Sequence, residues 1–258
     1  MSVTAAGAWH PRGELARLQR LLPRLLEIYE HITISIPLDA AEEIIRGVAT
    51  LPETTFIFYD EWSGRHAVVQ AALKQQTSHL QYIDLDRLVH WVETRPEELA
   101  QVVARIEQSD CLTIGRTPWA YGTHPESLRK TEMITNDAMS VYFECWMDFC
   151  AGSKGLSRRA AEYILKHSPR DMALRMDVGW AMLVKRAGHR LDYVEVDGME
   201  WETPDQFLDH VADAERQKRL ADEYDAKPES WEHRTRIAHE ILLAGLEAMN
   251  RKIAPIEE

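Results

Sequence analysis

The chain is poor in cysteine. Its 258 residues include three, Cys111, Cys145 and Cys150, and these have neither CxxC spacing nor a histidine pattern beside them. We therefore expect neither a structural zinc site nor a disulfide framework. An odd number of cysteines suits a reducing compartment.

Long apolar runs are also absent. No stretch approaches the roughly 20 apolar residues that span a bilayer, and residues 1–12 lack the charged-then-apolar order of a secretory signal. The sequence thus predicts a soluble, cytoplasmic protein without a transmembrane segment.

A basic surplus is missing as well, because the formal net charge is −12. Binding to a nucleic acid backbone needs stripes of Lys and Arg, so we expect no nucleic acid partner. A small anionic ligand needs only a few local cations and stays open. The chain also lacks a Walker GxxxxGK[ST] loop, an HExxH motif and a GxSxG elbow, which removes support for three common catalytic classes.

Strand-like and helix-like segments alternate along the chain. Short β-branched and aromatic runs predict strands, and capping signals such as Thr94-Arg95-Pro96-Glu97 open several of the helices between them. This alternation predicts an α/β fold with a mainly parallel sheet flanked by helices, in which ligands bind at the carboxyl ends of the strands. The expected strands are 32–37, 54–59, 79–83, 111–115 and 191–196.

The strongest candidate site is the run Leu80-Gln81-Tyr82-Ile83-Asp84-Leu85-Asp86-Arg87. If the strand continues through it, Asp84 and Asp86 lie on the same side of the backbone. Two carboxylates held together favour a divalent cation with a phosphate ligand, here Mg²⁺ or Mn²⁺. The alternative is a solvated strand end, with one aspartate capping the next turn.

Other polar residues follow the neighbouring strands. Asp60 is a candidate acceptor of hydrogen bonds from a base or ribose, and its alternative role is in a turn. Arg65 follows a glycine at an expected helix start, where a guanidinium suits a diphosphate or a surface ion pair. Arg87 and Arg116 are further candidate phosphate ligands.

The order of these elements resembles the GT-A glycosyltransferases, the nucleotide-diphosphosugar transferase fold, over about residues 32–198. The resemblance depends on strand 32–37, on the acidic segment 60–65, on the DxD-like Asp84-Leu85-Asp86, and on the glycine-containing segment 148–158. The asparagine-glutamate ending of the family's first strand is replaced here by Leu38-Asp39-Ala40.

The resemblance implies a role for each matching residue. Asp86, with Asp84, is expected to hold the cation, and Asp84 also to contact the nucleotide together with Asp60 and Arg65. Asp177 is expected to deprotonate the acceptor hydroxyl in an inverting reaction. The acceptor side is expected to include Asp148, Gly152 and Ser153.

The same resemblance divides the chain into an N-terminal helical segment (1–30), a nucleotide-sugar-binding catalytic domain (31–203) and a C-terminal helical extension (204–258). An apolar stripe in the extension is expected to pack either on the core or across a homodimer. It consists of Ala238, Leu242, Leu246 and Met249.

We therefore expect a metal-dependent glycosyltransferase that moves a sugar from a nucleotide-diphosphate donor to a small-molecule or glycan hydroxyl. One alternative is a nucleotidyltransferase acting on a sugar phosphate. Such enzymes carry a glycine-rich, basic loop after the first strand, and if that strand is 32–37, the loop Pro37-Leu38-Asp39-Ala40 has neither glycine nor lysine. The other alternative is a non-catalytic protein that binds a nucleotide or sugar.

Overall fold

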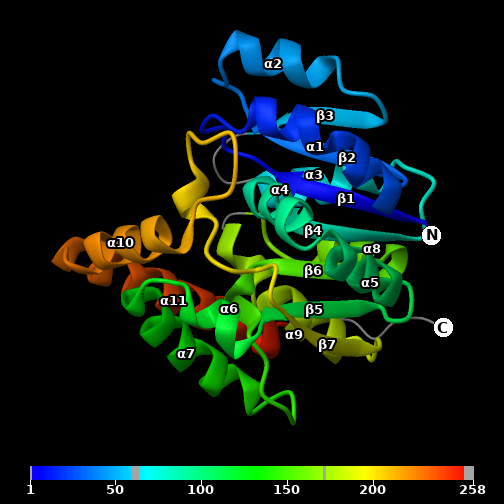
Figure 1. Ribbon diagram of the computed structural model, residues 1–258. Coiled ribbons are helices and arrows are strands. Elements are labelled where there is room, and N and C mark those ends of the chain that lie inside the picture. The colour runs from blue at the N-terminus through cyan, green and yellow to red at the C-terminus, as the bar shows by residue number, and fades with distance from the viewer. Residues whose placement is uncertain (1, 60–63, 171–172, 253–258) are drawn as a thin grey trace.

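In the computed structural model, which describes residues 2–59, 64–170 and 173–252, the strands form one twisted sheet (Figure 1). Its order is β3-β2-β1-β4-β6-β5-β7. The β6 strand is antiparallel to β4 and β5, and the other neighbours pair in parallel. The strands are β1 (Val3–Ala8), β2 (His31–Pro37), β3 (Thr54–Tyr59), β4 (His79–Asp84), β5 (Cys111–Arg116), β6 (Ser153–Ser157) and β7 (Leu191–Val196).

Helices cover both faces of the sheet, as parallel pairing requires. One apolar core joins the sheet to α1 (Leu15–Ile28), α2 (Glu42–Ala49), α4 (Leu85–Thr94) and α5 (Pro96–Ile106). The core on the opposite face joins it to α3 (Gly64–Ala72), α8 (Arg158–His167) and α9 (Gly179–Arg186). The predicted fold class, a mainly parallel α/β sheet flanked by helices, is confirmed.

The remaining helices lie beside the β5–β7 half of the sheet (Figure 1). They are α6 (Pro118–Gly122), α7 (Glu126–Ser140), α10 (Ala214–Asp225) and α11 (Pro228–Asn250), and three short 3₁₀ turns cover Phe149–Ala151, Ala173–Met176 and Thr203–Asp205. The α11 helix packs on α7 and α9. The stripe predicted from Ala238 to Met249 therefore has partners inside the chain, while a homodimer remains a prediction. None of the helices in the described ranges is long and apolar enough to cross a membrane.

The structure has two strands beyond the five expected, β1 and β6, and the start of α4 differs as well. Residues Val3–Ala8, assigned to a helical segment, form β1 in the middle of the sheet, paired with β2 and β4. Strand 32–37 is thus the second strand. In addition, α4 begins at Leu85, directly after β4, so the two aspartates do not share a strand.

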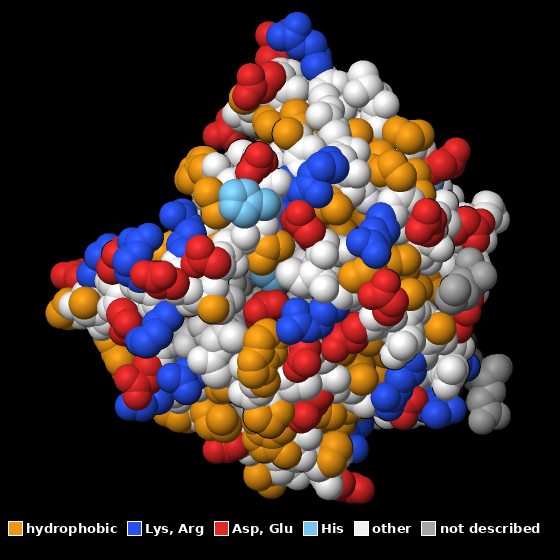
Figure 2. Space-filling model, in the orientation of Figure 1, with side chains coloured by type: hydrophobic (Ala, Val, Ile, Leu, Met, Phe, Trp, Pro, Cys, Tyr) orange, Lys and Arg blue, Asp and Glu red, His pale blue; other side chains and the backbone are white. Residues whose placement is uncertain are grey.

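The C-terminal helical extension was expected to begin at residue 204, and it contains two long helices, α10 and α11. The first one starts later, at Ala214, where the side chain of Asp213 accepts a hydrogen bond from the Arg216 N–H. Lysine and arginine alternate with acidic residues over α10 (Figure 2), and i,i+4 ion pairs such as Lys218–Asp222 connect them. This is the solvated helix face that its composition indicates.

Candidate nucleotide-phosphate site

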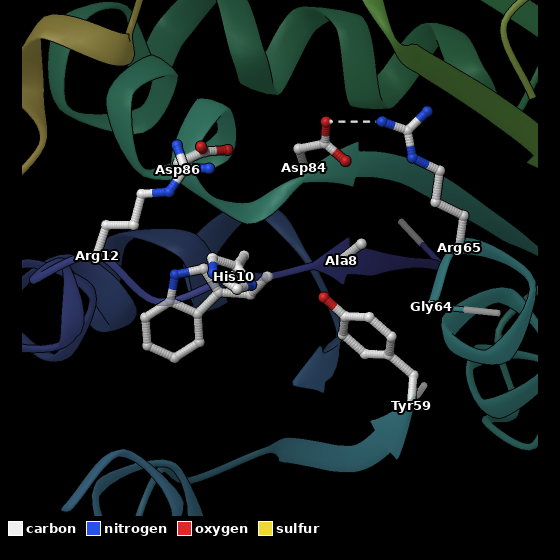
Figure 3. A pocket seen from close by; sticks show the side chains of 9 residues that line it. Ala8, His10, Arg12, Tyr59, Gly64, Arg65, Asp84 and Asp86 are labelled. Atoms are coloured by element: carbon white, nitrogen blue, oxygen red, sulfur yellow. Dashed lines mark hydrogen bonds and ion pairs between the residues drawn. The ribbon is translucent and has the colours of Figure 1, made fainter. Parts of the chain in front are cut away.

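A cavity of about 220 Å³ opens at the carboxyl ends of β1, β3 and β4. The last residues of these strands, Ala8, Tyr59 and Asp84, line it, as Figure 3 shows. In an open parallel sheet this edge is the usual place for a ligand. The other lining residues are Trp9, His10, Arg12, Gly64, Arg65 and Asp86.

The aspartate pair lies on this cavity, but its geometry differs from a strand-end pair. Asp84 is the last residue of β4 and the N-cap of α4, and Asp86 lies in the first turn of that helix. The expectation that both carboxylates lie on one side of a strand is therefore wrong. A helix N-terminus still favours negative charge, so the site can hold both side chains.

Asp84 is held from two sides. The hydroxyl of Tyr82 donates to its Oδ1 at 2.5 Å, and Arg65 Nη2 lies 3.3 Å from its Oδ2. Tyr82 comes from β4, which ends at the cavity, and Arg65 from α3, which begins there. The ion pair brings Arg65 and Asp84 together at the cavity, and their binding of a nucleotide remains a prediction.

Asp86 belongs to an acidic group that includes Glu202. Burial, together with the negative charges of Glu202 and Asp84, raises the pKa of Asp86 to about 7. Arg87 balances part of this charge, since its Nε lies 3.4 Å from Glu202 Oε1 and its Nη1 donates to the carbonyl of Ala151. No local signal in the sequence links Glu202 to residue 86.

These groups suit a hard cation in their chemistry. Asp84, Asp86 and Glu202 offer only oxygen donors and carry excess negative charge, which Mg²⁺ and Mn²⁺ prefer. Over the described ranges, however, no three His, Cys, Asp or Glu side chains are grouped closely enough to hold an ion by themselves. The donor set thus fits a cation that takes its remaining ligands from phosphate oxygens and water.

Asp177 lies between the 3₁₀ turn Ala173–Met176 and α9, and its side chain is buried. Its Oδ2 is 4.0 Å from Arg65 Nη1, so Arg65 lies between Asp84 and Asp177. Burial raises the pKa of Asp177 to about 6, while Arg65 and Lys154 oppose that rise. The structure thus brings the expected base and the expected phosphate ligand together across the end of the sheet.

The expected acceptor-side residues are more buried than most of those that line the cavity. Asp148 is fully buried, and its carboxylate accepts hydrogen bonds from Arg116 and Asn136. Ser153 is fully buried too, and donates to the Tyr82 carbonyl. Gly152 has a φ of +78°, and a Cβ there would meet Arg87 Nη1 at 2.9 Å and Asp177 Oδ1 at 4.0 Å. Gly152 thus lies beside Arg87 and Asp177, and the acceptor role of all three residues remains a prediction.

Arg116, a candidate phosphate ligand, is likewise buried, and it donates to Asp148 and Glu132. Asp60, the candidate base or ribose ligand, lies outside the described residues. The loop after β1 was missed altogether: His10 and Arg12 line the cavity, and Gly13 follows with a φ of +103°. The sequence signal for this loop was the polar, glycine-ended run His10-Pro11-Arg12-Gly13, which follows a short segment of small residues.

No known protein-family model matches this chain. A search of curated proteins gives no significant match either.

Solved structures show a distant likeness. One is a manganese complex of Rv0371c from Mycobacterium tuberculosis H37Rv (10% identity, TM-score 0.45), covering 76% of this chain and 89% of that chain. Another is CMP:2-keto-3-deoxy-manno-octonic acid synthetase complexed with CTP (10%, 0.46), with the same coverages of 76% and 89%. A third, from Desulfovibrio desulfuricans G20, is assigned as a nucleotide-diphospho-sugar transferase (11%, 0.41), covering 93% and 99%. At these values the likeness says nothing about the ligands or the activity of this chain.

Proposed function

We propose that this protein is a metal-dependent glycosyltransferase that moves a sugar from a nucleotide-diphosphate donor to a hydroxyl acceptor. The observation that carries the proposal is the cavity at the carboxyl edge of the sheet. It combines two carboxylates, Asp84 and Asp86, with two guanidinium groups, Arg12 and Arg65. A diphosphate with a divalent cation presents the complementary charges to both kinds of group.

Each side chain has a defined task in this proposal. Asp84 and Asp86 would hold Mg²⁺ or Mn²⁺, which when bound neutralises the departing nucleoside diphosphate as a Lewis acid. Arg12 and Arg65 donate hydrogen bonds to phosphate oxygens. In an inverting reaction, the acceptor proton passes to the Asp177 carboxylate while the acceptor oxygen bonds to the anomeric carbon and the bond from that carbon to the diphosphate breaks.

A nucleotidyltransferase is the second candidate, and the position of β1 favours it. With 32–37 as the first strand, the loop after it has neither glycine nor lysine, which counted against a nucleotidyltransferase. Since the first strand is Val3–Ala8, the loop that follows it is 9–13, which contains Arg12 and Gly13 and lines the cavity. The absence of a basic, glycine-containing loop therefore no longer counts against this reaction.

Calorimetry with Mn²⁺ and nucleoside diphosphates tests the common part of both candidates. We expect the double variant Asp84→Ala, Asp86→Ala to lose metal-dependent nucleotide binding at least tenfold. The matched control, Asp222→Ala with Glu223→Ala on exposed α10, removes the same charge and should bind as the native protein does. Normal binding by the Asp84, Asp86 double variant would refute the proposal.

Products separate the two reactions. A thermal-shift screen of UDP-, GDP-, ADP- and CDP-sugars with and without Mn²⁺ first identifies the donor, because a ligand of the native state raises its melting temperature by mass action. Release of nucleoside diphosphate from that donor supports the glycosyltransferase. Pyrophosphate release from an NTP and a sugar phosphate supports the nucleotidyltransferase instead. Binding without either product identifies a non-catalytic protein.

A further inference from the structure

Lys154 is a lysine buried in the middle of the sheet. It lies on β6, where it pairs with Tyr82 of β4 on one side and Thr113 of β5 on the other. Its relative exposure is 0%. Its Nζ finds no hydrogen-bond partner within the described ranges of the chain.

A buried ammonium without a partner is costly, so a charge close by must offset part of the cost. Burial lowers the pKa of Lys154, and the negative charge of Asp177 is the strongest influence in the opposite direction. The effect acts through space, without a hydrogen bond. The other ionisable groups that face Lys154 are Cys111 of β5, Cys150 of the 3₁₀ turn before β6, and Asp148.

Asp177 itself lies above the beginning of the same strand. A Cβ at Gly152, two residues before Lys154, would lie 4.0 Å from Asp177 Oδ1, while Arg65 of α3 lies 4.0 Å from Oδ2. Two cations of different accessibility thus surround this carboxylate. Arg65 lines the cavity, whereas Lys154 is enclosed. The acidic groups that oppose them are Glu132 of α7 and Asp84 of β4.

We propose that Lys154 is a positioning residue for Asp177, whose ammonium group keeps that carboxylate ionised and in place when Arg65 is engaged by a phosphate. The inference rests on the proposed function, in which Asp177 must be ionised to accept a proton. It assigns the two cations separate tasks. Arg65 serves the donor, and Lys154 serves the base.

The test is a carboxyl ¹³C NMR titration of Asp177, with Asp177→Asn identifying the resonance. We expect Lys154→Met, which keeps the side-chain length, to raise the pKa of Asp177 by about 1 unit. The melting temperature of this variant should stay equal or rise, because removing a buried charge without a partner costs little. Lys166→Met on the exposed part of α8 removes the same charge and should leave the Asp177 titration unchanged.

An unchanged Asp177 titration in Lys154→Met overturns the inference. If Lys154→Met does not fold, Lys154→Gln gives the same readout with a polar side chain. The reciprocal measurement needs no Lys154 variant: the ¹⁵Nζ of Lys154 should titrate at lower pH in Asp177→Asn.

Neither titration needs a substrate. If Lys154→Met shifts the Asp177 titration but Asp177→Asn retains full transfer activity, the two groups are electrostatically coupled and Asp177 is not the catalytic base. If the donor is known, Lys154→Met should also move the acidic limb of the pH–rate profile upward, which a purely structural role would not do.

Discussion

Replacing Asp148 by alanine should destabilise the protein strongly. The Asp148 carboxylate accepts from Arg116 Nε at 2.7 Å, from Arg116 Nη2 at 2.9 Å and from Asn136 Nδ2 at 2.9 Å. Burial alone would raise the pKa of Asp148, but the Arg116 guanidinium outweighs it and holds the pKa below its usual value. The charge pair is thus fully formed inside the core, beside Glu132, which accepts from Arg116 at 2.6 Å.

The expected cost follows from that burial. Arg116 is 2% exposed, so without Asp148 its charge loses one of the two counter-ions, Asp148 and Glu132, that the described part of the chain gives it. Breaking a buried pair by removing one partner costs about 3–5 kcal/mol. For a chain of this size about 2 °C of melting temperature corresponds to each kcal/mol, so we expect a loss of roughly 6–10 °C.

Calorimetric melting of Asp148→Ala measures this loss directly. Asp137→Ala is the control, because Asp137 is exposed on α7 and should change stability by less than about 0.5 kcal/mol. A melting temperature for Asp148→Ala within 1 °C of the native value would refute the reasoning. If the variant were stable but bound the acceptor poorly, Asp148 would instead be the acceptor ligand that the sequence resemblance implies.

Two further predictions concern the packing around α4. Burial lowers the pKa of His90, but its hydrogen bond with Asp205 outweighs burial and raises the pKa to about 9. The protonated His90 therefore stabilises the folded protein fully below pH 6.5, and this contribution disappears as the pH rises through 9. In denaturant unfolding, we expect the free energy of unfolding of the native protein to fall by about 3 kcal/mol over that pH range, and that of His90→Gln to stay constant. The same pH dependence in both proteins would show that His90 is not the group responsible. Gly198→Ala should cost about 1–3 kcal/mol, because its Cβ would overlap the Trp91 indole, whereas Gly122→Ala meets no atom within 4 Å and should leave the melting temperature unchanged. Equal melting of these two glycine variants would show that the loop at Gly198 relaxes freely.

The sequence predicts the sheet well where the strands carry β-branched residues. Segments 32–37 and 191–196 are strands within one residue of the expected bounds. The β1 strand escaped because Val-Thr-Ala-Ala-Gly-Ala consists mainly of residues with low β-propensity. Packing demands small side chains there, since a Cβ at Gly7 would lie 3.2 Å from the Leu85 side chain. At the centre of the fold, tertiary packing therefore outweighs the low β-propensity of these residues.

Parts of the site were predictable for a different reason. Asp84 and Asp86 are only two positions apart in the sequence, so a local motif could find them, and Arg65 was found from its helix start. Glu202 could not be found in this way, because it meets Arg87 across 115 positions of the chain. The strand geometry assumed for the aspartates failed because α4 begins one residue after Asp84.

The missed strand also changes the choice between the two reactions. If the proposed function holds, the number of cations around the phosphates helps to decide whether the cavity binds a nucleoside diphosphate or a triphosphate. Arg65 was expected on one side, but the loop after β1 adds Arg12 on the same cavity, with His10 between them in Figure 3. More positive charge at the nucleotide end favours a longer phosphate chain, whereas the acidic group of Asp86 and Glu202 favours a cation-bound diphosphate. The relative affinity for nucleoside diphosphate and triphosphate in the presence of Mn²⁺ therefore reports which of the two groups of charges dominates, while the products identify the reaction.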